Sequence, residues 1–187
     1  MTQTERIEAS TTKTLRDGRT VTIRPIAESD RAALQAFGTN LPANDSLYLE
    51  DDFQNPEITT RLANAASAEH WRQFVAQAED GTIVGYTSVR QLPGWSTHVA
   101  DIYLVVADDW RHAGLGSVLA ETIFAAAREL QAAKVIVQML DDQVDGQDIF
   151  HHLGFQVEGT LRKHACDRNG KIHDLLILSY HMDQSTA

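Results

Sequence analysis

The chain has 187 residues, 43% of them hydrophobic, which suits a single globular domain, and it holds no apolar run long enough to span a membrane. Its 26 acidic and 16 basic residues leave a formal charge of −10, which disfavours nucleic acid as a partner and either attracts a cationic substrate or simply aids solubility. The single cysteine, Cys166, excludes an intramolecular disulfide and a cysteine metal cluster, and the histidines lack metal-ligand spacing, so we expect no metal.

Residues 1–10 are polar and are expected to form a flexible N-terminus ahead of one domain over residues 11–183. They lack the basic-then-apolar pattern of a signal peptide, so we expect a cytoplasmic protein. The Asp17-Gly18 pair predicts a hairpin turn within residues 14–24, and Pro25 helps to end the second strand. A capped helix is expected over residues 29–37.

The central and C-terminal parts of the chain alternate strand and helix patterns, with hairpin turns at Asp80-Gly81 and Asn169-Gly170. The expected elements are a short helix near 57–66, strands 70–78, 82–89 and 99–107, a helix 114–130, a strand 134–140, a helix 147–153, and strands 155–163 and 172–182. This order predicts one α/β (α+β) domain with a mixed, mostly antiparallel twisted sheet flanked by helices, and no linker divides it.

One turn carries the clearest functional signal, because Arg111-His112-Ala113-Gly114-Leu115-Gly116 passes directly from a β-branched strand into an amphipathic helix. Glycines there let main-chain N–H groups approach an anion, and the helix N-terminus adds partial positive charge. The pattern lacks the lysine of an ATP or GTP P-loop and the third glycine of a dinucleotide turn. Packing is the alternative reason for two glycines at such a turn.

The run from Val99 to Ser117 resembles the acetyl-CoA signature of the GNAT superfamily of N-acetyltransferases: a strand, then [QR]-x-x-G-x-[GA], then a long helix. The run from Ile149 to Phe155 resembles the family's second motif, an x-Y-x-x-x-G-F junction between helix and strand. With the N-terminal strand–helix region and the closing hairpin, the resemblance covers about residues 15–182. It implies transfer of the acetyl group from acetyl-CoA to a primary amine, by direct attack within a ternary complex.

The resemblance also implies where the cofactor binds. Backbone amides of the turn would hold the CoA pyrophosphate, while the strand before the turn would contact the pantetheine arm and aim the amide of Val105 at the thioester carbonyl. Gln143 would hydrogen-bond the pantetheine amide, and Arg111 either adds a cationic contact or lies on the surface. The implied cofactor-binding residues are Leu104, Val105, Val106, Arg111, His112, Ala113, Gly114, Leu115, Gly116, Ser117, Gln143 and Phe150.

Asp101 occupies the position where the family often has a glutamate base, and its shorter side chain suggests a relay through water. Alternatively, Asp101 pairs with a basic neighbour or binds substrate, and His98 is a second candidate base. Phe150 stands where many members have a tyrosine that protonates the leaving thiolate, so packing is its better interpretation. His151 or His152 could replace that acid, although both fit a helix surface. The missing tyrosine keeps a second function open, a non-catalytic acyl-CoA sensor or interaction module.

The acceptor is not identified by the sequence. Loosely, the opening is similar to bacterial protein lysine acetyltransferases and the ending to ribosomal-protein-type and small-amine members, so a small amine, an amino acid, and a protein lysine or N-terminus all remain candidates. The acyl group could also be larger than acetyl. A homodimer through the closing strands stays open. The loop 42–56 is a candidate substrate wall, or merely a solvated loop; its relevant residues are Asp45, Leu47, Tyr48, Glu50, Asp51, Asp52 and Phe53.

Overall fold

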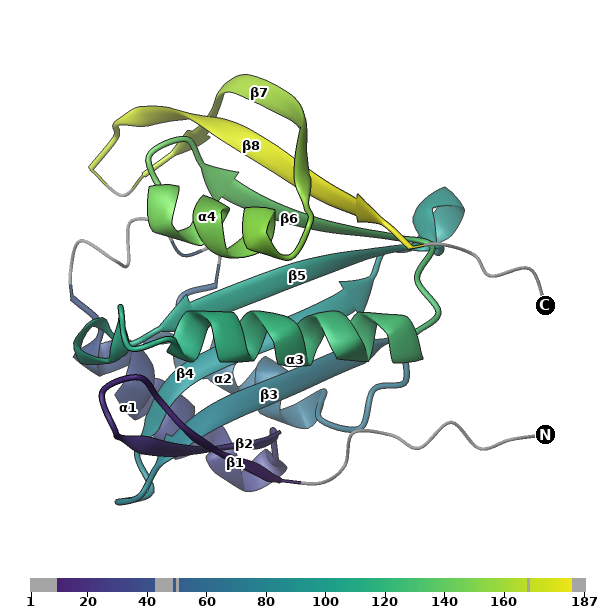
Figure 1. Cartoon of the computed structure of the whole chain (residues 1–187). Helices are drawn as coiled ribbons and strands as arrows, with labels where there is room; N and C mark the ends of the chain where they lie inside the picture. Colours follow the sequence, from purple (N-terminus) through teal and green to yellow (C-terminus); the bar gives the residue numbers. More distant parts are fainter. Residues whose placement is uncertain (1–9, 43–48, 50, 168, 183–187) are drawn as a thin grey trace, which may run out of the picture.

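The computed structural model describes residues 10–42, 49, 51–167 and 169–182. Its strands and α-helices follow one another along the chain as Figure 1 shows. They are β1 (Thr11–Thr14), β2 (Thr20–Pro25), α1 (Arg31–Asn40), α2 (Pro56–Asn64), β3 (Trp71–Ala78), β4 (Ile83–Gln91), β5 (Val99–Val106), α3 (Leu115–Glu129), β6 (Lys134–Leu140), α4 (Val144–His152), β7 (Gln156–Cys166) and β8 (Ile172–His181).

All eight strands form one sheet in the order β1-β2-β3-β4-β5-β6-β8-β7. Every neighbouring pair is antiparallel except β5 and β6, which run parallel because α3 crosses over between them. The predicted mixed, mostly antiparallel sheet is therefore confirmed, as are the hairpins at Asp17-Gly18 and Asp80-Gly81, where Gly18 and Gly81 adopt φ of 85° and 88°.

Helices cover both faces of the sheet (Figure 1). α3 lies across one face, and its residues Leu115, Leu119 and Ile123 are completely buried at the helical spacing that the sequence predicts. α4 joins the same core through Phe150. α1 and α2 pack on the opposite face in a second apolar cluster that includes Phe53 and Tyr86.

Most expected boundaries shift by one to three residues, and the changes in α4, β7 and α1 have the clearest structural causes. α4 begins at Val144, three residues earlier than predicted, and β7 extends to Cys166 through two irregularities in its pairing with β8. α1 begins at Arg31, after a short 3-10 turn over Glu28–Asp30, and no side chain caps it. Within the part of the chain that the structure describes, no helix is long and apolar enough to cross a membrane.

Candidate active site

The two parallel strands separate at one end of the sheet. β5 pairs with β6 from Val99 opposite Lys134 as far as Ile102 opposite Val137, and the pairing between the described residues stops there. Figure 1 shows β5 and β6 side by side at their N-terminal ends and diverging toward their C-terminal ends. The backbone from Tyr103 to Val106 therefore keeps β4 on one side and faces a gap on the other.

The hydrogen-bond alternation of β5 decides which amides face this gap. Ala107 N–H donates to Val84 C=O, and Thr87 Oγ1 donates to Tyr103 C=O, both on the β4 side. Since successive residues of an antiparallel strand point alternately toward and away from a neighbour, Val105 also points its N–H at β4. Leu104 and Val106 point toward the gap. The predicted Val105 amide therefore does not face the gap, and the neighbouring N–H that does is that of Leu104.

The glycine turn lies where β5 leads into α3. Gly114 adopts φ of 94°, and the first hydrogen bond of the helix runs from Val118 N–H to Gly114 C=O. The N–H groups of Leu115, Gly116 and Ser117 come before that bond, so no carbonyl within the helix is placed to accept from them. Together with the positive end of the helix dipole they fit a phosphate group.

The β1–β2 hairpin packs against this turn, a contact that sequence reasoning missed. Arg16 N–H donates to Ala113 C=O at 3.0 Å, and the Arg19 guanidinium lies 3.9 Å from the Trp110 ring centre. The side chain of Arg16 runs beside Gly114, with Nε 3.5 Å from the position that a Cβ would take there. This hairpin therefore fixes the turn and brings a further guanidinium to it.

Three predicted cofactor residues make contacts within the protein. Arg111 donates from Nε and Nη2 to Val106 C=O, both at 3.3 Å, and its Nη1 lies 3.2 Å from Asp108. Gln143 Oε1 accepts from Leu140 N–H at 2.8 Å, so this oxygen is already bonded within the protein. Phe150 is 3% exposed and meets Phe155 edge-on at 5.2 Å between ring centroids, as its packing interpretation predicts.

A cavity of about 380 Å³ opens beside the gap. Asp101 lines it from β5, and Gln138 on β6 donates from Nε2 to Asp101 Oδ2 at 3.2 Å. At about 3.3 Å per strand residue, Asp101 lies roughly 10 Å along β5 from Leu104, a span that suits a proton relay through water. The described residues that line the cavity are Leu49, Asp101, Ile102, Tyr103, Gln138, Met139, Leu140, Gln143, Ala165, Cys166, Asp167 and Leu175.

The other candidates for acid–base and acceptor roles lie elsewhere. His98 is exposed and precedes β5, roughly 20 Å of strand from Leu104. His151 and His152 are exposed on α4, and their Nδ1 atoms contact the main-chain oxygens of Phe155 and Asp148.

The predicted acceptor wall is only partly described. Asp45, Leu47, Tyr48 and Glu50 lie outside the described residues, whereas Leu49 lines the cavity. Phe53 is 1% exposed and belongs to the core, which corrects its assignment to a substrate wall. Asp51 pairs with Arg61, and Asp52 Oδ1 accepts from Gln54 N–H.

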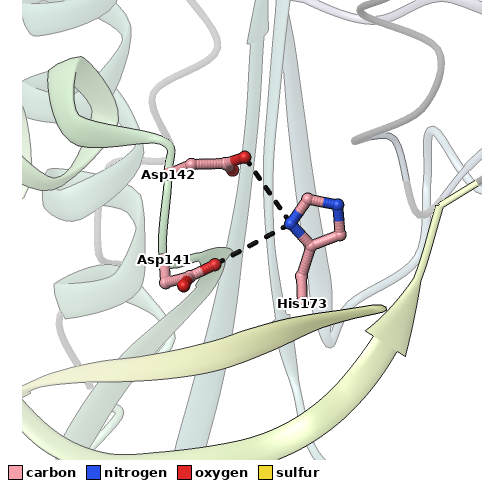
Figure 2. A group of neighbouring side chains, drawn as sticks. All are labelled: Asp141, Asp142 and His173. Atoms are coloured by element: carbon pink, nitrogen blue, oxygen red, sulfur yellow. Dashed lines mark ion pairs between the residues drawn. The ribbon is translucent and has the colours of Figure 1, made fainter. Parts of the chain in front are cut away.

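A cluster of charged groups adjoins the cavity at Asp167, and the sequence did not reveal it. His173 has a nearly buried side chain whose Nε2 lies 3.1 Å from Asp167 Oδ2. Its Nδ1 faces Asp142 at 3.5 Å and Asp141 at 3.8 Å, as Figure 2 shows. The hydrogen bond with His173 holds the pKa of Asp167 below its usual range.

The residues in Figure 2 also have the chemistry of metal ligands, since one atom from each of Asp141, Asp142 and His173 lies within 4.8 Å of the others. The pair Asp141-Asp142 at the end of β6 was the available signal. His173 lies 31 positions after Asp142 in the sequence, and the pairing of β6 with β8 brings it close to the two aspartates.

Comparison with known proteins supports the architecture. Residues 39–155 match the model of the acetyltransferase (GNAT) family. A ribosomal-protein-S5-alanine acetyltransferase from Vibrio fischeri has a similar structure, with a TM-score of 0.77 and 16% identity, over 88% of this chain and 94% of its own. The structure of yncA from Salmonella typhimurium, solved with its cofactor acetyl-CoA, has a TM-score of 0.76 and 18% sequence identity. The match covers 89% of this chain and 96% of that chain.

A GNAT-family acetyltransferase from Streptococcus pneumoniae gives a TM-score of 0.75 and 21% identity, over 87% of this chain and 99% of its own. No curated protein matches the chain. At these identities the solved structures establish the fold, whereas the family model spans more than half of the sequence. The chain therefore belongs to the acetyltransferase (GNAT) family.

Proposed function

We propose that this protein is an acetyl-CoA-dependent N-acetyltransferase acting on a primary amine. The observation that carries the proposal is the end of β5–β6 pairing after Ile102. It leaves the Leu104 amide facing a gap that has a phosphate-binding turn at the end of β5 and a cavity containing Asp101 beside it.

In this proposal the cofactor enters from the side of the α3 N-terminus. The amides of Leu115, Gly116 and Ser117 bind the pyrophosphate, and the Arg16 guanidinium adds positive charge beside them. Bound acetyl-CoA supplies the activated acetyl group. The backbone of Leu104 and Val106 pairs with the pantetheine arm in place of the missing stretch of β6.

Two groups of the chain then act on the reaction. Asp101 accepts a proton from the ammonium group of the acceptor, through water, so that the amine nitrogen can bond to the thioester carbon. Leu104 N–H donates to the thioester oxygen as negative charge develops there, and this stabilises the transition state. The carbon–sulfur bond breaks, the attacking nitrogen releases its second proton and the thiolate takes up one proton, so the products are an amide, the free thiol of CoA and the proton first taken by Asp101. Holding both reactants together removes the need for a covalent acyl-enzyme.

Titration calorimetry with acetyl-CoA and an assay of thiol release over a panel of amines test the proposal. We expect binding and release with at least one primary amine. Tight binding without release from any amine would favour the alternative, an acyl-CoA sensor, for which the buried Phe150 in place of a tyrosine is the motivating observation. Absence of acetyl-CoA binding would contradict both functions. Competition with propionyl-CoA and succinyl-CoA identifies the acyl group.

A further inference from the structure

The glycine turn lies between two neighbouring segments of the chain. α4 packs on one side of it, where a Cβ at Gly116 would lie 2.8 Å from Cδ1 of Ile149. The β1–β2 hairpin lies on the other side, as Figure 1 shows, and its Arg16 N–H donates to Ala113 C=O at 3.0 Å. Any anion that binds at this turn therefore has the hairpin beside it.

The side chain of Arg16 follows the turn. Its Cγ, Cδ and Nε lie 3.6, 3.7 and 3.5 Å from the position that a Cβ would take at Gly114. The guanidinium carbon is bonded to Nε, so the cationic group lies close to the N-terminus of α3. Within the described part of the chain, no hydrogen bond or ion pair engages this guanidinium.

Arg19 holds the hairpin in this position. Its Nη2 donates to Asp109 C=O at 2.9 Å, and its guanidinium lies 3.9 Å from the ring centre of Trp110. Both contacts join the hairpin to the segment just before the glycine turn. Arg19 therefore binds groups of the protein, whereas the guanidinium of Arg16 is available to a ligand.

A guanidinium beside a helix N-terminus is unfavourable by itself. The N-terminus of a helix carries partial positive charge, so it attracts anions and repels cations. A phosphate group that lies next to both features would be attracted by both. The formal charge of −10 on the chain repels a polyanionic cofactor, which makes a local cation at the turn more important for binding.

We propose that Arg16 binds a phosphate group of the CoA thioester from the side of the β1–β2 hairpin, and that it thereby determines the affinity for the cofactor. The inference rests on the proposed function for the identity of the ligand, and it assigns cofactor specificity to a residue outside β5 and the glycine turn. The phosphate is either part of the pyrophosphate or the 3′-phosphate of the ribose, and dephospho-CoA, which lacks only the latter, distinguishes the two.

Calorimetric titration of the Arg16→Gln variant with acetyl-CoA tests the contact. We expect Kd to rise about five- to tenfold, the effect of one charge-assisted contact at an exposed site. The matched control is Lys13→Gln, which removes a positive charge from β1 of the same hairpin and should change Kd by less than about twofold. Equal losses in the two variants would overturn the proposal, because they would report only the net charge.

Titrations with acetyl-dephospho-CoA identify the phosphate. If Arg16 binds the 3′-phosphate, the wild type prefers acetyl-CoA to acetyl-dephospho-CoA, and Arg16→Gln abolishes this preference. If Arg16 binds the pyrophosphate, Arg16→Gln weakens the binding of both cofactors by the same factor. Either result supports the proposal, whereas wild-type affinity of Arg16→Gln for both cofactors would overturn it.

Thermal unfolding separates a binding role of Arg16 from a structural one. Without cofactor, Arg16→Gln should unfold at the wild-type Tm or slightly above it, because the repulsion from the positive end of α3 is removed. At one fixed concentration of acetyl-CoA, the rise in Tm should be smaller for the variant than for the wild type. A lowered Tm without cofactor, combined with an undiminished rise on adding it, would assign Arg16 to stability and overturn the proposal.

Binding and turnover measured together separate this inference from the proposed function. If no amine is acetylated but Arg16→Gln weakens the binding of acetyl-CoA, acetyl transfer fails and the cofactor contact stands. If amines are acetylated and Arg16→Gln keeps the wild-type Kd and KM for acetyl-CoA, the cofactor contact fails and acetyl transfer stands.

Discussion

At the scale of single residues, the direction of each backbone amide of β5 decides which N–H group faces the gap and is available for the proposed chemistry. The backbone N–H of Leu104 faces the gap and that of Val105 faces β4, although the two residues have similar side chains. The side-chain amide of Gln138 on β6 donates a hydrogen bond to the carboxylate of Asp101 on β5, close to where the two strands separate. The proposed chemistry can therefore be tested by replacing one group at a time.

Replacing Leu104 by proline removes the N–H that faces the gap and leaves the hydrogen bonds of Val105 and Tyr103 to β4 in place. Proline is tolerated where the lost N–H is outside the ladder, so we expect a folded protein with kcat lowered about 10²-fold, the usual loss for one such donor. Leu104→Ala controls for the side chain and should retain most of the activity. Val105→Pro should unfold the protein, as circular dichroism would show. Normal turnover in folded Leu104→Pro would refute the assignment.

Replacing Asp101 by asparagine keeps the shape of the side chain and abolishes proton acceptance. We expect kcat to fall by about 10²-fold or more, a typical effect of losing a general base, with unchanged affinity for acetyl-CoA. The loss should shrink at high pH, where more of the acceptor is already deprotonated. A uniform loss across the pH range would assign Asp101 to substrate binding instead.

At the scale of elements, contacts between neighbouring segments hold the candidate site in shape. A Cβ at Gly116 would lie 2.8 Å from Cδ1 of Ile149, so the start of α3 packs directly on α4. The β1–β2 hairpin supports the turn from the other side through Arg16 and Arg19.

The α3–α4 contact can be tested with a double-mutant cycle. Gly116→Ala alone should lower the free energy of unfolding by about 1–2 kcal/mol through overpacking. Ile149→Val deletes the methyl group in question, and in that background Gly116→Ala should stabilise by about 0.5–1 kcal/mol, the helix preference of alanine over glycine. Urea denaturation measures the free energy of unfolding of the wild type, the two single variants and the double variant. Additive effects would show that the two residues do not meet.

The ion pair between Arg24 on β2 and Asp30 before α1 links the sheet to the helical layer. Arg24 donates from both terminal nitrogens to Asp30 at 2.7 and 2.8 Å, and Ala27 N–H adds a third bond. Burial alone would raise the pKa of Asp30, but these hydrogen bonds outweigh it and lower the pKa below 3.8. A depressed folded pKa means that this stabilisation is present above about pH 4 and is lost as the pH falls further.

Accordingly, Asp30→Asn should cost about 2 kcal/mol of stability at neutral pH, because a half-buried guanidinium loses its counter-ion. The difference from wild type should narrow below pH 4, where the carboxylate of Asp30 is protonated first in the unfolded chain and, at lower pH, in the folded protein. Urea denaturation at neutral and acid pH checks both statements. A difference that stays constant down to pH 2.5 would contradict the assigned linkage.

At the scale of the whole molecule, the sheet separates the two halves of the candidate site. The glycine turn belongs to the face covered by α3, whereas Tyr103 and Val105, which share a face of β5 with Asp101, belong to the face covered by α1 and α2. The surrounding charge of −10 then acts on every ligand that approaches.

This charge predicts how salt affects the reaction. A cationic acceptor is attracted by the negative field, so raising the ionic strength should increase its KM by screening. An uncharged acceptor of the same length, or one measured at high pH, should show a much weaker dependence. Steady-state kinetics over a series of salt concentrations measures this dependence of KM. A salt-independent KM for a cationic amine would contradict the expected attraction by the negative charge of the protein.

Much of this architecture could be predicted from local patterns. The hairpins follow from Asp-Gly and Asn-Gly pairs, and α3 follows from its apolar period, because both depend on neighbours in sequence. The helix at 29–37 was misplaced because Asp30 binds Arg24, six positions away, and does not cap α1. Phe53 likewise looked like a loop residue, although it packs against Phe37 and Tyr86 from other elements.

The sequence by itself indicated the family, and it predicted an anion-binding role for the glycine turn and a catalytic role for the strand before it, since these patterns depend on residue types at short spacing. The tertiary structure alone decided that Leu104, one residue from the predicted Val105, faces the gap, because hydrogen-bond direction depends on pairing with β4. It alone brought Asp167 to the cavity with Asp101, through the pairing of β8 with β6 and β7. Contacts between distant strands have no local signature, so only folding reveals them.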